Sequence, residues 1–184
     1  MKTIRTFLPL ALAALAVATA QADAGNPAFH QRLEKDGLTF VVDVEAGEPA
    51  AEGRYEITVY RGDELAARLD GLRRAEIAAA TMTDLNRNGQ PEVVLLLNGR
   101  GNAPRDRLRI YEWNDLYLSL VELPALPALA DEAPALYRVD NDRLLCTADN
   151  EGRREVFAFD FQARAWIPAS EGRSWLQRLP LIGD

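Results

Sequence analysis

The chain is poor in the side chains that most often build reactive centres. It has one cysteine, Cys146, and one histidine, His30, in 184 residues. A single cysteine cannot form a disulfide within its own chain, and a lone histidine does not supply the ligand set of an ordinary zinc site. Cys146 stands in the apolar run 144–147, which favours a buried, inert thiol over an intermolecular bridge.

Hydroxyl nucleophiles are also scarce. The serines are Ser119, Ser170 and Ser174, and His30 lies far from all three in sequence, so nothing supports a serine triad. The glycine-rich stretch 98–101 is not followed by a helix start, which a phosphate-cradling loop would need. The pairs of acidic residues stand at turn positions, which explains them without catalysis. We therefore expect no catalytic residues and a protein that is not an enzyme.

The N-terminal segment carries the signals of export. Lys2 and Arg5 precede the alanine- and leucine-rich run Phe7–Ala18, and small residues at cleavage spacing follow it. This pattern predicts a secretory signal peptide over 1–22, because the run is too short for a membrane span; an uncleaved anchor is the alternative. We expect a lead segment over 23–36 and a single β domain over 37–184 to follow the signal peptide. The protein is then expected to be periplasmic or secreted.

The mature chain has a marked acidic excess. Removal of Lys2 and Arg5 from the 21 basic residues leaves 19 against 28 acidic residues, a net charge of −9. This charge argues against nucleic acid and anionic membranes as partners, because their phosphates attract positive surfaces. It suits a cationic partner, or solubility alone. A homodimer stays open.

Short β-rich segments follow one another, and no long amphipathic helix interrupts them. Period-two alternation in Tyr55–Tyr60 buries one face of a strand, whereas Glu64–Leu69 fits either a short strand or one helical turn. This pattern predicts an all-β protein, an antiparallel sandwich or a flattened barrel. The alanines of 75–82 would suit a helix, but the position of this stretch before a turn and a buried strand favours an extended conformation. The remaining expected strands are 37–44, 93–97, 107–113, 116–123, 136–139, 143–147, 155–161 and 165–167, with a terminal strand or turn at 175–179.

The stretch 84–92 has the clearest chemical pattern. Oxygen side chains alternate along it and a glycine follows, which resembles the calcium loops of integrin-type propeller blades. The ligands of such a site would be Asp84, Asn86, Asn88, Gln90 and Glu92. A metal-free turn is the favoured alternative, because only two of these residues carry charge and asparagine and glycine form turns without metal. No cofactor is expected unless this loop holds calcium, and a single copy of the motif excludes a whole propeller.

Five segments follow one another in a distinctive order: an early strand over 40–47, a G-x-Y strand from Gly53, the turn at 84–94, a glycine-rich loop and an aromatic strand at 108–113. This order resembles that of the family of periplasmic inhibitors of invertebrate-type lysozyme. The resemblance covers roughly residues 38–123. It implies a β-sandwich that blocks an enzyme by inserting a loop into its active-site cleft, with a lysozyme or another cationic cell-wall hydrolase as the partner.

The inserted loop departs from the family pattern. The family's loop is similar to S-x-G-S-G-x-Y, whereas this chain has neither serine nor tyrosine there. The corresponding partner-binding residues would be Asn98, Gly99, Arg100, Gly101 and Asn102. Arg100 could pair with the two acidic groups of a glycosidase, or it could be a solvated arginine on a hairpin loop. A calcium-stabilised structural or adhesion-like β module, or an exported β domain of another role, remains the alternative function.

Overall fold

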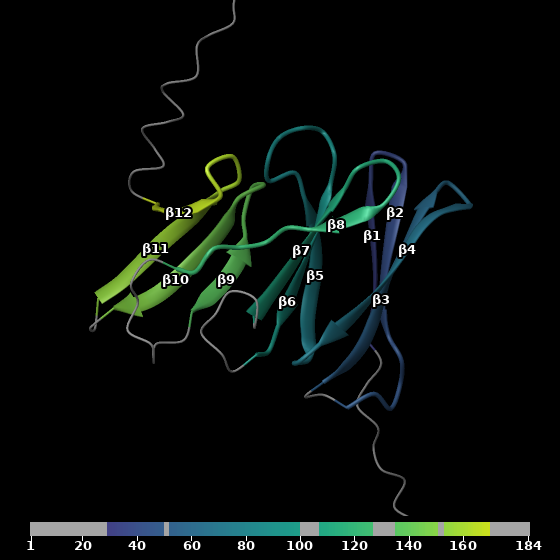
Figure 1. The fold of residues 1–184 in the computed structure, drawn as a ribbon, viewed down its shortest axis with the longest axis horizontal. Coiled ribbons are helices and arrows are strands. Elements are labelled where there is room, and N and C mark those ends of the chain that lie inside the picture. The colour runs from purple at the N-terminus through teal and green to yellow at the C-terminus, as the bar shows by residue number, and fades with distance from the viewer. Residues whose placement is uncertain (1–28, 50–51, 100–106, 127–134, 151–152, 170–184) are drawn as a thin grey trace, which may run out of the picture.

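The computed structural model describes residues 29–49, 52–99, 107–126, 135–150 and 153–169. The predicted signal peptide, the predicted loop residues Arg100, Gly101 and Asn102, and the predicted terminal element at 175–179 lie outside these residues. Within them the chain is all-β, as predicted, and forms three open antiparallel sheets of four strands each (Figure 1). The sandwich alternative is therefore correct, and the described strands close no barrel.

Each sheet is a meander of four consecutive strands. Sheet A contains β1 (Phe29–Lys35), β2 (Leu38–Val44), β3 (Gly53–Arg61) and β4 (Glu64–Arg73). Sheet B contains β5 (Ile77–Thr83), β6 (Glu92–Leu97), β7 (Leu108–Trp113) and β8 (Leu118–Leu120). Sheet C contains β9 (Leu136–Val139), β10 (Leu144–Asn150), β11 (Arg153–Asp160) and β12 (Ala165–Pro168). Glu64–Leu69 is thus part of a strand, not a helical turn.

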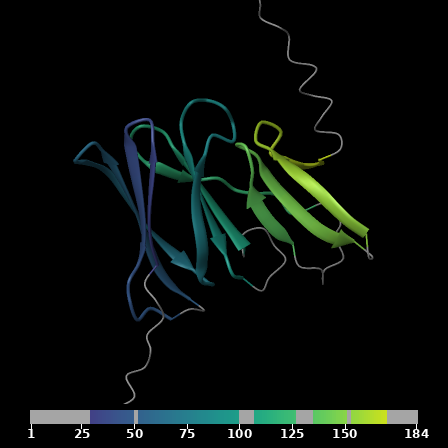
Figure 2. The same ribbon diagram turned by 180° about the vertical axis from the view of Figure 1, so that it is seen from behind.

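The three sheets stack face to face, with sheet B between sheets A and C (Figures 1 and 2). One core cluster fills the space between sheets A and B, and a second fills the space between B and C. Strand β6 serves both clusters, because Val93 and Leu95 belong to the first and Val94 to the second. Alternate side chains of a strand point to opposite faces, so a strand buried on both faces reads as an unbroken apolar run.

The β domain begins earlier than residue 37. Residues 29–35, predicted to belong to the lead segment, form β1 and pair along their whole length with β2. The inward side chains of Phe29 and Leu33 pack against the core between sheets A and B. The side chain of Gln31 also reaches across to β5, where it accepts a hydrogen bond from the Ala80 N–H at 2.9 Å and donates to the Ala80 carbonyl at 2.7 Å. These contacts lie in the tertiary structure, so the weak apolar pattern of 29–35 did not reveal them.

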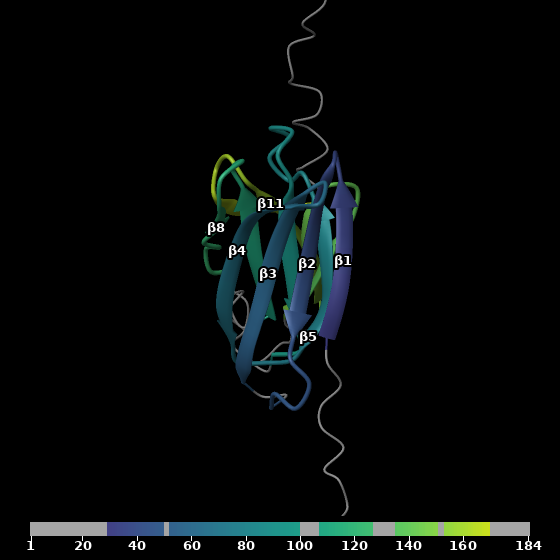
Figure 3. The same cartoon turned by 90° about the vertical axis from the view of Figure 1, so that its right-hand side faces the viewer.

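The outer face of sheet A is polar. Figure 3 views this sheet from its broad side, with the four strands in sequence order. His30 and Asp43, opposite each other on β1 and β2, are joined by a 2.5 Å hydrogen bond between Nδ1 and Oδ1. Arg68 on β4 pairs with Glu56 on β3. A polar outer face and an apolar inner face are what antiparallel strands with one solvated side require.

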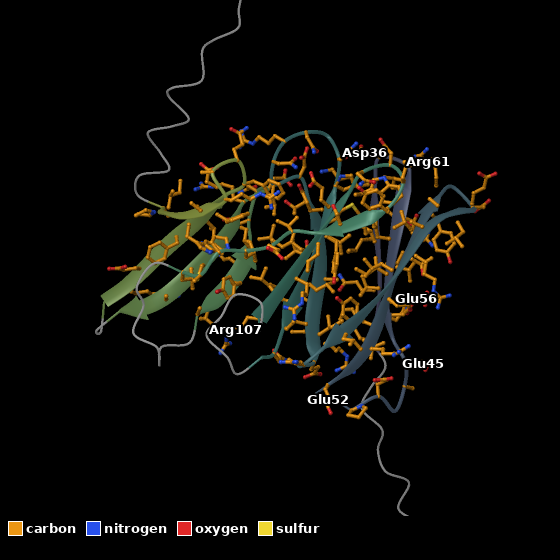
Figure 4. All side chains as sticks on the ribbon, in the orientation of Figure 1. Asp36, Glu45, Glu52, Glu56, Arg61 and Arg107 are labelled. Carbon is orange, nitrogen blue, oxygen red and sulfur yellow. The ribbon has the colours of Figure 1, made fainter. Side chains whose placement is uncertain are left out.

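Hairpin turns from all three sheets gather at one end of the molecule. The turn that carries Asp36 and the end of β3 at Arg61 lie at this end, and Arg107 lies at the opposite end (Figure 4). Arg61 donates to the Asp115 carboxylate at 3.3 Å, which joins the β3–β4 and β7–β8 turns. No helix among the described residues is long and apolar enough to cross a membrane.

Candidate functional site: an acidic loop on the central sheet

The loop between β5 and β6 is shaped by its own side chains. The Asn86 Oδ1 accepts the backbone N–H of Asn88 at 3.0 Å, and the Asn88 Oδ1 accepts that of Gln90 at 2.7 Å. The Asp84 Oδ2 accepts the N–H of Gly89 at 3.1 Å. Asparagine and aspartate side chains commonly replace backbone partners in this way in tight turns. The alternating oxygens therefore have a structural use in the absence of any metal.

Left-handed backbone conformations complete the turn. Arg87 has a φ of 59° and Gly89 a φ of 82°. The Arg87 N–H donates to the Asp84 carbonyl at 3.3 Å, which closes the first part of the loop. Glycine adopts positive φ angles at little energetic cost, which explains why the motif has a glycine at position 89.

A fully buried carboxylate lies beneath the loop. Glu92, the first residue of β6, has no exposed surface, and its Oε2 accepts the backbone N–H of Leu85 at 2.7 Å. The other oxygen of Glu92, Oε1, is buried and has no hydrogen-bond partner among the described residues. The same is true of the Asp84 Oδ1. Buried polar atoms in folded proteins are almost always paired, so two unpaired carboxylate oxygens in one loop need an explanation.

The surroundings of Glu92 oppose its ionisation. Burial raises the pKa of Glu92 from 4.5 to about 7, and the negative charges of Asp84 and Glu112 add to the rise. The hydrogen bond from the Leu85 N–H acts in the opposite direction, because it stabilises the charged carboxylate. A proton or a cation at this place would therefore stabilise the loop.

Glu112 is a member of the site that sequence reasoning missed. It stands on β7 directly opposite Glu92 on β6, so two acidic residues face each other across neighbouring strands. The Glu112 Oε1 accepts hydrogen bonds from the side-chain amides of Asn86 at 2.6 Å and Asn88 at 3.1 Å. The only signal was the alternation of 108–113, which could not reveal the register between β6 and β7.

Asp142 joins the site from sheet C. Its Oδ1 accepts the Thr83 hydroxyl and the Asp84 N–H, both at 3.0 Å. The hydrogen bond from the Asp84 N–H is the main reason that the pKa of Asp142 is lowered, because it stabilises the ionised carboxylate. These hydrogen bonds thus connect the β9–β10 turn of sheet C to the loop between β5 and β6 of sheet B.

The predicted metal ligands are only partly brought together. Asp84 and Glu92 offer free buried oxygens, whereas Asn86 and Asn88 direct their amide nitrogens at Glu112. The side chain of Gln90 turns away and donates to the Asp115 Oδ2 at 3.2 Å. Across the described parts of the chain, no three acidic, histidine or cysteine side chains are grouped as metal ligands. Cation binding would therefore need the Glu112 carboxylate or the asparagine amides to turn.

The predicted partner-binding loop leaves the opposite end of sheet B. Its first residue, Asn98, is fixed by two hydrogen bonds to Glu76: backbone N–H to carbonyl at 2.9 Å, and Nδ2 to Oε2 at 3.1 Å. Gly99 is the last described residue before the gap, and the chain resumes at Arg107 on the way into β7. The strands that carry this loop, β6 and β7, are the most buried neighbouring pair of sheet B.

Two further polar groups lie inside the stacked sheets. Cys146 is fully buried, as its apolar run predicts, and burial raises the pKa of its thiol to about 11. The Tyr55 hydroxyl is hydrogen-bonded to that of Tyr111 across the interface of sheets A and B. Burial is the main reason that the pKa of Tyr55 is strongly raised, so the Tyr55 hydroxyl stays neutral.

Comparison of the chain with protein-family models, curated proteins and solved structures finds no match.

Proposed function

We propose that this protein is exported and acts as a non-catalytic binding protein, of the kind that blocks a lysozyme or another cationic cell-wall hydrolase. The active element is the connection between β6 and β7, with Asn98, Gly99, Arg100, Gly101 and Asn102 at its start. The observation that carries the proposal is the fixed base of this connection. A binding loop loses less conformational entropy on association when its ends are already held in place.

The base is rigid for reasons that lie in the described residues. Strand β6 is packed on both faces, and Asn98 directly follows it with two hydrogen bonds to Glu76. On the other side of the gap, Leu108 begins β7 with 1% of its surface exposed. The two ends of the connection therefore lie in the central layer of a three-layer stack.

The charges of the proposed partners are complementary. Arg100, Arg105 and Arg107 stand in or beside the connection, although the chain as a whole is acidic. Glycosidases work with two carboxyl groups in their cleft, and arginine binds carboxylates through two parallel hydrogen bonds. The acidic body of the protein would attract a cationic enzyme and speed the encounter.

Titration against lysozymes tests the proposal. The purified mature protein is added to goose-, chicken- and invertebrate-type lysozymes in a cell-wall clearing assay. We expect saturable one-to-one inhibition of at least one class. Arg100→Ala should weaken that inhibition, and Arg138→Ala serves as the matched control, because Arg138 is an exposed arginine on β9 of sheet C.

Two results would contradict the proposal. Absence of inhibition of every class at micromolar protein would remove the inhibitor function. Equal inhibition by the wild type, Arg100→Ala and a variant with 99–105 replaced by a short glycine–serine linker would show that another surface is responsible.

A second function, a calcium-stabilised module, is favoured by the free buried oxygens of Asp84 and Glu92. Calcium is bound by carboxylate and carbonyl oxygens, and its charge would remove the repulsion between Asp84, Glu92 and Glu112. At a calcium concentration one hundred times its dissociation constant, binding would stabilise the fold by about 2.7 kcal/mol. Thermal unfolding in calcium and in chelator measures this difference.

The variant Glu92→Gln separates ion binding from a general effect of salt. It should abolish the response to calcium, whereas Glu122→Gln, which changes an exposed glutamate after β8, should keep it. A wild-type melting temperature that is the same in millimolar calcium, magnesium and chelator would exclude this second function.

A further inference from the structure

Exposed apolar side chains concentrate along one side of the stacked sheets. Among the described residues, five of the six exposed large hydrophobic side chains come from β4, the β7–β8 turn and β8; they are Leu65, Leu72, Leu116, Tyr117 and Leu120. Strands β4 and β8 are the last strands of sheets A and B, and they contact each other. We call this side the β4–β8 edge. Such a concentration on one side marks an interaction surface more often than scattered single residues do.

Strand β4 is an open sheet edge. It is the longest described strand, with 10 residues, and β3 is its sole partner among the described strands. Strand β5, the first strand of sheet B, differs from β4 in this respect. The Gln31 side chain forms hydrogen bonds with both the N–H and the carbonyl of Ala80 on β5. A long strand whose outer N–H and C=O groups are unpaired is a template for another strand.

The sequence of β4 is complementary to itself. When two copies run antiparallel with Leu69 opposite Leu69, Arg68 of each copy stands opposite Asp70 of the other. The same register places Ala66 opposite Leu72, and it does so twice because of the two-fold symmetry. Opposite charges facing each other across strands stabilise the pairing, as do paired apolar side chains.

The neighbouring registers are disfavoured by the same charges. A two-fold axis at residue 68 would place Arg68 opposite Arg68, and an axis at residue 70 would place Asp70 opposite Asp70. Like charges directly opposite destabilise a strand pair. The charges of β4 thus select one register. The irregularity of β4 is at Ala66, which has no partner on β3. The residues that set the register, Arg68, Leu69 and Asp70, lie in the stretch 67–73, which pairs regularly with β3.

We propose that the β4–β8 edge binds a second copy of this chain through antiparallel pairing of β4 with β4, centred on Leu69. Sheet A then continues into sheet A of the partner subunit as one eight-stranded sheet. Leu72 of each copy comes to lie against Ala66 and Leu65 of the other. The β7–β8 turn flanks this contact, because the ion pair of Arg61 and Asp115 holds it beside the start of β4. This proposal is independent of the proposed function.

A charge exchange tests both the contact and its register. Sedimentation velocity of the mature protein over a range of concentrations should show a dimer. Asp70→Arg and Arg68→Asp each place like charges opposite each other at two symmetric positions, so each should raise the dimer dissociation constant at least about tenfold. The double variant Arg68→Asp/Asp70→Arg restores opposite charges in the same register and should dimerise again.

The variants also change contacts within each subunit, because Arg68→Asp removes the ion pair of Arg68 with Glu56. Residue 70 stands opposite Glu56 on β3, so an arginine there gains an ion-pair partner within the chain. Circular dichroism and thermal unfolding check each variant. Glu34→Arg is the matched control, because it reverses an exposed charge on β1, at the other edge of the same sheet.

Three results would overturn the proposal. The wild type could be a monomer at every concentration. The dimer could be unaffected by both single reversals, or weakened by Glu34→Arg instead. The double variant could stay monomeric although it folds, which would show that the two charges do not face each other in the dimer.

Discussion

Replacement of Glu92 by glutamine should change the pH dependence of stability in a predictable way. Glu92 is fully buried, and its pKa rises from 4.5 to about 7 on folding. Between these values the folded protein holds a proton that the unfolded chain releases. The free energy of unfolding therefore contains a contribution that is complete below pH 4.5 and is lost as the pH rises through about 7.

The magnitude follows from the two pKa values. The interval from 4.5 to about 7 corresponds to about 3 kcal/mol at 1.36 kcal/mol per pKa unit. Glutamine has the shape of the protonated acid and cannot ionise. In the presence of chelator, Glu92→Gln should therefore match the wild type near pH 4 and exceed its free energy of unfolding by about 3 kcal/mol at pH 8.

Urea denaturation at a series of pH values, followed by tryptophan fluorescence, measures this difference. Only the difference between the two proteins matters, because other carboxylates such as Asp142 contribute equally to both. Glu122→Gln, at an exposed position, provides the control and should follow the wild type at each pH. A gap between wild type and Glu92→Gln that is the same at pH 4 and pH 8 would refute the reasoning.

Three further predictions concern the packing of the sheets. Gly71→Ala should destabilise the fold by about 1–3 kcal/mol in thermal or chemical unfolding, because the added Cβ would lie 2.1 Å from the Tyr55 ring; a stability equal to wild type would contradict the close packing. Tyr111→Phe should cost about 1 kcal/mol, because it leaves the buried Tyr55 hydroxyl unpaired, and Tyr55→Phe in addition should cost little more; a double-mutant cycle without coupling would exclude the hydrogen bond. Cys146 should resist a thiol reagent at pH 8 until the protein unfolds, because its thiol is buried and its pKa is about 11; rapid labelling of the native protein would disprove this.

Much of the strand pattern could be predicted from the sequence. The alternation in 55–60 and the apolar run 93–97 both correspond to strands, β3 and β6. The alanine-rich stretch before the acidic loop is extended, as its position before a turn suggested, and forms β5. These predictions were correct because the pattern of apolar and polar residues along a strand reflects which of its faces are buried.

The first strand could not be predicted in the same way. Residues 29–35 contain only two inward apolar side chains, Phe29 and Leu33, and their partners lie on β2 and on sheet B. The division into three stacked sheets could not be predicted from the sequence either. Alternation along a strand shows that one of its faces is buried, but not which other sheet packs against that face.

The candidate site shows the same limit. The sequence predicted a tight loop at 84–92, and the side chains of Asn86 and Asn88 do bind the backbone of this loop. It did not reveal Glu112, because that residue joins the loop only through the pairing of β6 with β7. It also did not reveal that Asp142 binds the Thr83 hydroxyl, since 59 residues separate the two in the chain.

The sequence by itself determined the β class, the strand periods, the tight acidic loop and the buried place of Cys146, because each of these depends on side chains close together in the chain. Tertiary structure alone decided that Glu92 is surrounded by other carboxylates, that β6 is covered on both faces and that β4 forms an open edge. Those properties arise from the pairing and stacking of distant strands, where desolvation and repulsion between charges depend on neighbours that local patterns do not specify.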